Sequence, residues 1–190
     1  MIYLASSSPR RAALLKQAGI DFTVIEPHID ERPHPVEPGL AYVRRMAREK
    51  CAAGRSGVRA RQSPAHPVLA ADTIVLLGDE VLHKPDTETD ARALLQRLSG
   101  REHEVFTALC LDVEGRLCEA LCASRVTFKY LSDAQIDAYC RTGEPLGKAG
   151  GYAIQGRAAL FIRRLEGSYS GVMGLPLYEL GELLSAEGLL

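Results

Sequence analysis

Long apolar runs are missing from this chain. No stretch approaches the ~20 consecutive apolar residues that a helix needs to cross a bilayer. The short apolar run of residues 1–4 is followed by Arg10 and Arg11, whereas a secretory signal carries its basic residues before the apolar run. We therefore expect a cytoplasmic protein that has no membrane partner.

The sequence also lacks the common signatures of metal, disulfide and nucleotide sites. Its five cysteines are odd in number, without C-x-x-C spacing or histidine companions, so neither a disulfide framework nor a zinc site is supported. Neither G-x-x-x-x-G-K-[ST] nor G-x-G-x-x-G occurs, and we find no internal repeat or low-complexity tract. Any nucleotide site must therefore be built in another way.

The composition is that of a soluble globular protein. The chain has 190 residues, 46% hydrophobic and 25% charged, which suits one domain or two closely joined lobes. Residues 1–61 hold 11 Lys and Arg against 6 Asp and Glu, and residues 62–190 hold 12 against 18. This division fits a small polyanionic ligand met by cations and by metal-binding carboxylates. It is too weak to indicate a nucleic-acid partner.

The first stretch reads as strand, tight loop and helix. Residues 1–4 are apolar, three serines follow, and Pro9 suits the first position of a helix for which Ser8 is a good N-cap. Free N–H groups at a helix N-terminus, nearby hydroxyls and two arginines favour an anion such as a phosphate chain. The alternative is an ordinary capped helix with solvated arginines.

A helix is predicted over residues 38–53, after an irregular, proline-rich loop over residues 26–35 that carries Asp30 and Glu31. The apolar stripe of this helix places Lys50 on the buried face, where an ammonium needs an anion unless its stem snorkels to water. We expect the other charged residues of the helix to be solvated, Asp30 and Glu31 to form either a site or a solvated turn, and residues 54–67 to be a mobile basic loop.

Residues 68–77 form an apolar strand interrupted by Asp72. A carboxylate buried without a partner costs several kcal/mol. Metal binding or general-base work would account for it, as would a structural role at a strand end. Lys84 projects after the hairpin strand of residues 80–82, and His103 is expected to be structural or exposed.

The remaining elements alternate between strand and helix. We expect a helix over 89–98, paired strands over 102–113 and 117–128, a helix from Ser132 to Arg141, a glycine-rich segment over 143–156, a strand over 159–165, a loop over 166–173 and a helix over 176–184. This order predicts an α/β fold around a mixed sheet.

Taken together, several short motifs resemble the Maf family of nucleoside triphosphate pyrophosphatases, which is related to the inosine triphosphatase fold. They are LASSSPRR at 4–11, YVRRMAREK at 42–50, ADT at 71–73, KP at 84–85, LSG at 98–100, KAG at 148–150, IQG at 154–156 and GLP at 174–176. The resemblance implies a single Maf-like domain over residues 1–190, with a mixed twisted sheet flanked by helices and two lobes that enclose an active-site cleft.

The resemblance also implies roles for individual residues. Asp72 matches the catalytic acid, and Glu31 matches a loop acid that helps Asp72 to hold a divalent cation, Mg²⁺ or Mn²⁺. The residues that match the phosphate-binding set are Ser6, Ser8, Arg10, Arg11, Lys50 and Lys84. Arg10, Thr73 and Gln155 match the combination of the branch that acts on dTTP and UTP. Gly147 stands where the family pattern has an aspartate.

The function implied is hydrolysis of dTTP and UTP to the monophosphate and pyrophosphate. Modified pyrimidine nucleotides are an alternative substrate class, which would make this a house-cleaning enzyme. A different alternative is a non-catalytic regulator of cell division or septum formation that binds nucleotides or nucleic acid. A carboxylate beside a polyphosphate weakens simple binding unless a metal intervenes, so Asp72 favours the enzyme. The sequence leaves a homodimer open.

Overall fold

The computed structural model describes residues 1–190, and the chain divides into two compact units. The first unit comprises Met1–Asp72, Thr107–Cys122 and Gly174–Leu190, and the second comprises Thr73–Phe106 and Ala123–Met173. The boundary between them crosses three long strands, so each unit holds one end of each of these strands. None of the helices combines the length and the apolar character that spanning a membrane requires.

The strands form one seven-stranded mixed sheet in the order β2-β1-β3-β5-β6-β7, with β4 paired to β3. They are β1 (Ile2–Ala5), β2 (Phe22–Ile25), β3 (Val68–Leu77), β4 (Glu80–Leu82), β5 (Glu102–Val113), β6 (Arg116–Phe128) and β7 (Ile162–Glu166). β1 runs parallel to β2 and β3, whereas β4 and β7 run antiparallel to β3 and β6. The predicted α/β class with a mixed sheet flanked by helices is therefore confirmed.

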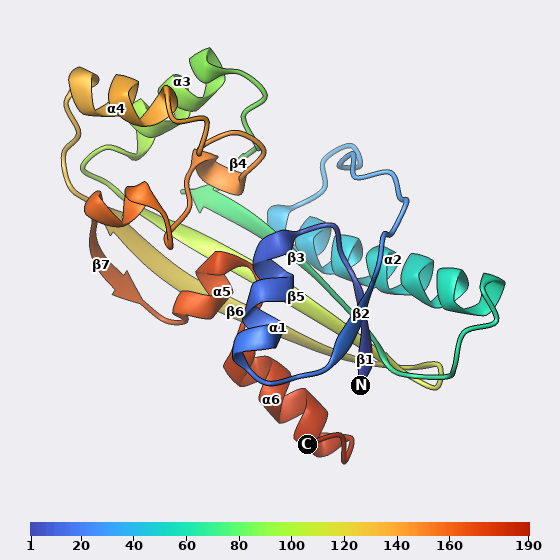
Figure 1. Ribbon diagram of the computed structural model, residues 1–190. Coiled ribbons are helices and arrows are strands. Elements are labelled where there is room, and N and C mark those ends of the chain that lie inside the picture. Colours follow the sequence, from blue (N-terminus) through green and yellow to red (C-terminus); the bar gives the residue numbers. More distant parts are fainter. The chain divides into compact units, whose positions relative to one another are not determined.

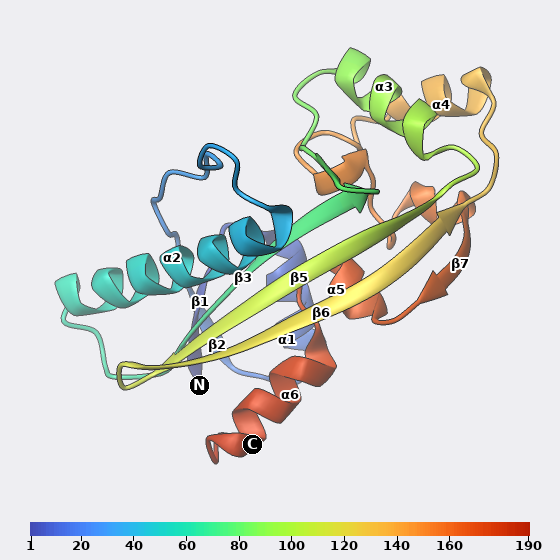
Figure 2. The ribbon, with the colours of Figure 1, turned by 180° about the vertical axis from the view of Figure 1, so that it is seen from behind.

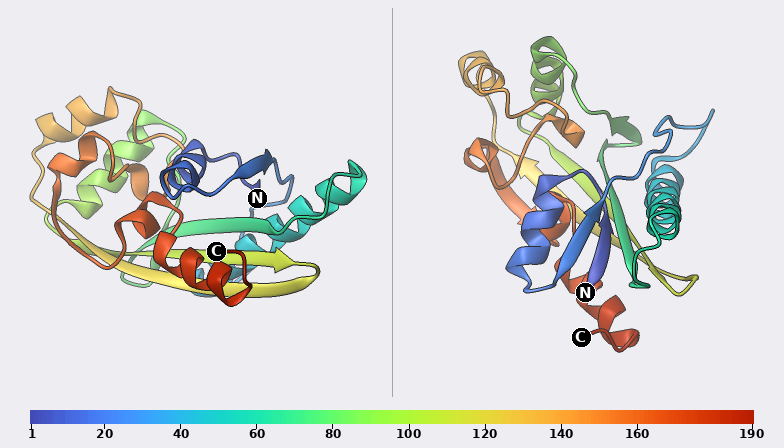
Figure 3. Two further views of the ribbon diagram at one scale, coloured as in Figure 1. Left: turned by 60° about the horizontal axis from the view of Figure 1, so that its bottom comes forward. Right: turned by 45° about the vertical axis from the view of Figure 1, so that its right-hand side comes forward.

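In the first unit, helices α1 (Pro9–Gln17) and α2 (Gly39–Ala60) lie on opposite faces of the parallel strands (Figures 1 and 3). The chain leaves β1 toward β2 on one side, then returns across β1 to β3 on the other. Right-handed crossovers in opposite directions place their helices on opposite faces. Both connections therefore bring a helix end to the same edge of the strands, where β1 and β2 end.

The last helix of the first unit, α6 (Leu177–Ala186), is tied to the hairpin of β5 and β6. The Glu187 carboxylate pairs with Arg116 and accepts a hydrogen bond from the Cys118 thiol. Figure 3 shows α6 lying along this hairpin. Glu114 and Gly115 both have positive φ in the turn, as a two-residue hairpin loop with right-handed twist requires.

Helices of the second unit begin with the capping patterns that the sequence carries. These helices are α3 (Glu88–Leu98) and α4 (Asp133–Cys140), which pack together (Figure 2). The Thr87 and Ser132 side chains each cap a helix and complete a capping box with the residue at N3. The second unit also contains the 3₁₀ helices η1 (Ala149–Gly151) and η2 (Arg157–Leu160) and the short helix α5 (Tyr169–Met173).

The core of the second unit is built on aromatic side chains that meet edge to face. The Phe128 ring lies 5.0 Å from Tyr152 and 6.3 Å from Phe161, and His103 lies 5.1 Å from Phe128. His103 is structural, as expected, but it is buried: its Nε2 contacts the Tyr152 hydroxyl at 2.8 Å and its Nδ1 has no hydrogen-bond partner. Burial lowers the pKa of His103 to about 4.

Three predicted segments differ from the structure. Residues 54–60 continue α2 instead of starting a loop, because Gly54 lets the helix approach Ala5 and Arg55 pairs with Asp112 on β5. Residues 157–160 form η2, so β7 begins only at Ile162. Helix α5 occupies most of the segment expected to be a loop, and its start is held by the Ser168 hydroxyl, which accepts from the Gly171 N–H.

The close approach at Gly54 generates a prediction for stability. A Cβ at this position would lie 2.6 Å from the Ala5 Cβ and 2.9 Å from the Val68 Cγ1. We expect Gly54→Ala to lower the free energy of unfolding by about 1–3 kcal/mol. In Gly181→Ala, where nothing lies within 4 Å of the added Cβ on α6, we expect a gain of about 0.5–1 kcal/mol. Urea unfolding of both variants tests this, and equal effects would contradict it.

His103 generates a second prediction, on pH. The folded protein holds the pKa near 4, below the ordinary 6.5, so the unfolded chain binds more protons between these values. The stability that the neutral His103 contributes is therefore fully present above pH 6.5 and is lost as the pH falls toward 4. At pH 5 the loss is on the order of 2 kcal/mol. Between pH 7 and pH 5, the free energy of unfolding measured with urea should decrease less for His103→Gln than for the unsubstituted protein. Equal decreases would refute the role given to His103.

Candidate active site

Three charged side chains of the first unit meet at one point. The Lys50 ammonium from α2 lies 2.7 Å from an Asp72 carboxylate oxygen on β3 and 3.1 Å from a Glu31 carboxylate oxygen. Lys50 and Asp72 are buried, with side chains 7% exposed, whereas the Glu31 side chain is 45% exposed. Lys50 therefore lies on the inner face of α2 as predicted, and the anions that it contacts are these two carboxylates.

The start of α1 contributes a second group of polar atoms. Ser6, just after β1, is buried, and its Oγ accepts hydrogen bonds from the Ser8 N–H at 3.1 Å and from Arg11 Nη1 at 3.2 Å. Arg11 Nε donates to the carbonyl of Gly174 at 2.8 Å. The hydroxyl of Ser8 makes no cap hydrogen bond, although Ser8 is the N-cap residue, so it is not committed to the helix.

Both arginines at this helix start lie in partly or fully desolvated surroundings. Burial lowers the pKa of Arg10 from its ordinary value. Burial also lowers the pKa of Arg11, and the positive charge of Arg10 adds to this effect, whereas the negative charges of Asp72 and Glu31 oppose it. Guanidinium groups stay protonated despite such shifts. Two permanent cations, two carboxylates and Lys50 are therefore grouped within the first unit.

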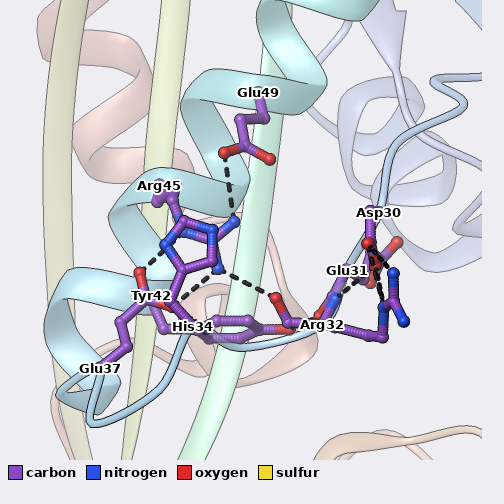
Figure 4. Close-up of polar contacts among 8 residues, drawn as sticks. All are labelled: Asp30, Glu31, Arg32, His34, Glu37, Tyr42, Arg45 and Glu49. Atoms are coloured by element: carbon purple, nitrogen blue, oxygen red, sulfur yellow. Dashed lines mark hydrogen bonds and ion pairs between the residues drawn. The ribbon is translucent and has the colours of Figure 1, made fainter.

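Glu31 belongs to an irregular segment, residues 26–38, that is fastened to α2 (Figure 4). Arg45 donates to both oxygens of Glu37 at 2.7 Å and to the backbone carbonyl of Arg32 at 3.1 Å. The Tyr42 hydroxyl donates to the Glu31 carbonyl at 2.8 Å. The loop expected from its prolines is confirmed, but it is held in place by side chains of the following helix.

The other predicted site residues belong to the second unit. Thr73 follows Asp72 on β3 and is half-buried, whereas Lys84 and Gln155 are exposed. Lys84 precedes Pro85, whose carbonyl accepts a hydrogen bond from the Gly147 N–H. Gly147 has φ +66°, and only its backbone makes this contact, so the absence of an aspartate there leaves the contact intact.

Gln155 lies in a segment that Glu144 organises. The Glu144 carboxylate accepts from the Tyr139 hydroxyl at 2.8 Å and from the Arg157 N–H at 3.1 Å, at the start of η2. A Cβ on Gly156 would lie only 2.4 Å from this carboxylate. The glycine in IQG is therefore required by the close approach of an acidic side chain, and that approach fixes the backbone that carries Gln155.

Sequence reasoning missed the residues that hold these segments. Arg45 was expected to be solvated, yet its side chain is only 18% exposed, because it satisfies the carboxylate of Glu37 and the carbonyl of Arg32. The one available signal was charge: the acidic Glu37 stands just before α2, eight positions before the basic Arg45. The sequence assigned no role to Tyr42, although it begins the motif of residues 42–50, or to Glu144, because their partners are backbone groups or residues of another segment.

The donor set fits a hard divalent cation. No group of three or more His, Cys, Asp or Glu side chains gathers in the chain. However, Asp72 and Glu31 each contact the Lys50 ammonium, so their oxygens converge on one small region. Mg²⁺ is commonly held by one or two carboxylates together with substrate phosphates, not by an all-protein cage. These two carboxylates are therefore the residues that would hold the metal.

The arrangement combines the groups that phosphoanhydride chemistry needs. Cations at Arg10, Arg11 and Lys50 can neutralise phosphate oxygens, and hydroxyls at Ser6 and Ser8 can donate to them. Asp72 can hold a cation or accept a proton from water. The nature of these groups favours an anionic, phosphorylated ligand.

Comparisons with known proteins agree with this chemistry. A family model described as Maf-like protein matches residues 1–187. A protein of Bordetella parapertussis named dTTP/UTP pyrophosphatase is 48% identical over 192 residues, covering 99% of this chain and 93% of its own. Proteins of the same name from Aromatoleum aromaticum and Chromobacterium violaceum are each 46% identical, covering 98% of this chain and 95% and 94% of their own.

Among solved structures, the Ham1 protein of Staphylococcus aureus aligns with 70% of this chain and 72% of its own, at 14% identity and a TM-score of 0.40, a likeness too low to carry an argument. The family model and the relatives, by contrast, cover nearly the whole chain. The protein therefore belongs to the Maf family.

Proposed function

We propose that this protein is a nucleoside triphosphate pyrophosphatase that hydrolyses dTTP and UTP to the monophosphate and pyrophosphate. The observation that carries the proposal is the convergence of Lys50, Asp72 and Glu31 in the same unit as the α1 arginines. The name shared by relatives up to 49% identical supports the choice of substrates. A nucleotide substrate also supports the proposal of a cytoplasmic location.

The proposed reaction is attack of water on the α-phosphorus, which breaks the bond to the bridging oxygen and releases pyrophosphate. Arg10 and Arg11 bind phosphate oxygens and stabilise the negative charge that the leaving pyrophosphate gains. The hydroxyls of Ser6 and Ser8 donate hydrogen bonds to phosphate oxygens, and Lys84 adds a further cation. These contacts hold the chain of phosphates in one orientation, which lowers the entropic part of the barrier.

Asp72 accepts the proton of the attacking water, and the Lys50 ammonium, 2.7 Å away, holds the Asp72 carboxylate in orientation. A divalent cation held by Asp72 and Glu31 would supply charge neutralisation at the phosphates and a more acidic water. Oxygen ligands of this kind suit Mg²⁺ and Mn²⁺ alike.

For the base, we propose that Gln155 reads the edge of a pyrimidine with its amide, which offers two donors and one acceptor. Arg10 and Thr73 complete this specificity set. One ring substituent is worth only ~1–3 kcal/mol of discrimination, so modified pyrimidine nucleotides belong to the same substrate class.

Product analysis tests the proposal directly. Purified protein with Mg²⁺ and a panel of nucleoside triphosphates should release pyrophosphate, not orthophosphate, and chiefly from dTTP and UTP. Release from another base would retain the chemistry and reject the roles of Arg10, Thr73 and Gln155. Nucleotide binding without turnover, whichever divalent metal is added, would reject the proposed enzymatic activity and favour the non-catalytic regulator.

The role of Asp72 gives a further prediction. Asp72→Asn keeps the size of the side chain but removes its charge and its basicity, so we expect kcat for dTTP to fall by about 10²–10³-fold. Asp79→Asn, in the exposed turn between β3 and β4, is the matched control and should stay within two-fold. Circular dichroism spectra should show both variants folded; an Asp72→Asn protein as active as its control would exclude Asp72 as the base.

A further inference from the structure

The placement of Glu31 calls for an explanation beyond its own loop. Residues 26–38 contain no helix or strand, and an irregular segment of this kind leaves a side chain many positions to sample. Yet the Glu31 carboxylate lies 3.1 Å from the Lys50 ammonium. Some contact outside the segment must therefore limit its freedom.

Arg45 supplies one such contact. Its guanidinium donates to both carboxylate oxygens of Glu37, and its Nη2 also donates to the backbone carbonyl of Arg32. The side chains of Arg45 and Glu37 are only 18% and 9% exposed. A bidentate ion pair between a guanidinium and a carboxylate fixes the relative orientation of the two side chains more firmly than a single hydrogen bond does. Hydrogen bonds from Arg45 lower the pKa of Glu37 to about 2, so the contact stays charged at neutral pH.

Tyr42 supplies the second contact, at the residue in question. Its hydroxyl donates to the backbone carbonyl of Glu31 at 2.8 Å, and the Arg45 guanidinium lies 5.6 Å from the centre of its ring. This hydrogen bond restrains the backbone at Glu31 itself.

Both anchors belong to the helix that carries Lys50. Tyr42 and Arg45 lie two turns and slightly more than one turn before Lys50 on α2. A single rigid element thus sets the position of the ammonium and, through the two anchors, the position of the loop that approaches it.

We propose that Tyr42 and Arg45 are positioning residues that hold the Glu31 carboxylate beside Lys50 and Asp72. The role of Glu31 as a ligand for a divalent cation rests on the proposed function. The role of the two anchors in placing Glu31 rests on the contacts alone.

The same segment provides matched controls. The side chains of Asp30 and Arg32, 59% and 87% exposed, pair with each other within the loop, and Arg32 meets α2 through its backbone carbonyl alone (Figure 4). Glu49 pairs with Arg45 along the helix and does not contact the loop. Asp30→Asn and Glu49→Gln therefore remove charges next to the anchors without removing a contact between loop and helix.

The test compares Tyr42→Phe and Glu37→Gln with these two controls. Hydrogen exchange of the backbone amides of Glu31 and of residues 34–37 should be faster in the anchor variants and unchanged in the controls; Arg32 is left out because its amide donates to the Asp30 carboxylate. Titration with Mn²⁺ in the presence of a dTTP analogue with a non-hydrolysable α–β bridge, followed by electron paramagnetic resonance, should show about 10-fold weaker metal binding in the anchor variants. The Mg²⁺ concentration for half-maximal turnover should rise to match.

Combination with Glu31→Gln separates positioning from a general effect on folding. If the anchors act through Glu31, Tyr42→Phe adds no further loss of Mn²⁺ affinity to a protein that already carries Glu31→Gln. Additive losses, or anchor variants that behave like the controls, would overturn the proposal. If the unsubstituted protein turned over no nucleotide, the proposed function would fail, but hydrogen exchange and Mn²⁺ binding would still decide the role of the anchors.

Discussion

The contact between Lys50 and Asp72 is the constraint on which the first unit depends. Two oppositely charged groups are withdrawn from water, and removal of either would leave an uncompensated buried charge, which typically costs 3–5 kcal/mol. The contact joins the middle of α2 to the middle of β3. Such pairs contribute little net stability compared with apolar packing, so a chain that carries one must gain something else from it. Here the gain is a carboxylate fixed in orientation next to the arginines of α1.

Other features of the first unit maintain that geometry. Gly54 lets α2 pack closely on β1 and β3, one turn after Lys50, so the helix cannot shift without a clash or a gap. On the other side, the carbonyl of Gly174 and the hydroxyl of Ser6 hold the Arg11 guanidinium. The short motifs of the sequence therefore have distinct physical tasks. The motif that ends at Lys50 supplies a charge, GLP supplies the Gly174 carbonyl, and IQG supplies the glycine that allows the close approach of Glu144.

Strands and hairpins were predictable because their signals are local. The turn at Glu114–Gly115 and the capping box at Ser132 depend on residues within four positions of one another. Lys50 and Asp72 were also predictable, since each is a charge in an apolar pattern. The continuation of α2 through Gly54 was not, because glycine disfavours a helix locally and the packing that compensates comes from β1. The roles of Arg45, Tyr42 and Glu144 were not predictable for the same reason, since their partners are set by the fold.

The two units differ in what their site residues are suited to do. All the carboxylates and most of the cations proposed for phosphate and metal chemistry belong to the first unit, whereas Thr73 and Gln155, proposed for base recognition, belong to the second. Gln155 is placed by Glu144 and Gly156, which make no use of the contact between Lys50 and Asp72. If Gln155 reads the base as proposed, substitutions around Glu144 alter the preference for a base and leave the contact between Lys50 and Asp72 in place. Arg10, on α1, is the exception: it is proposed to serve both phosphate binding and specificity, so changes there should affect rate and selectivity together.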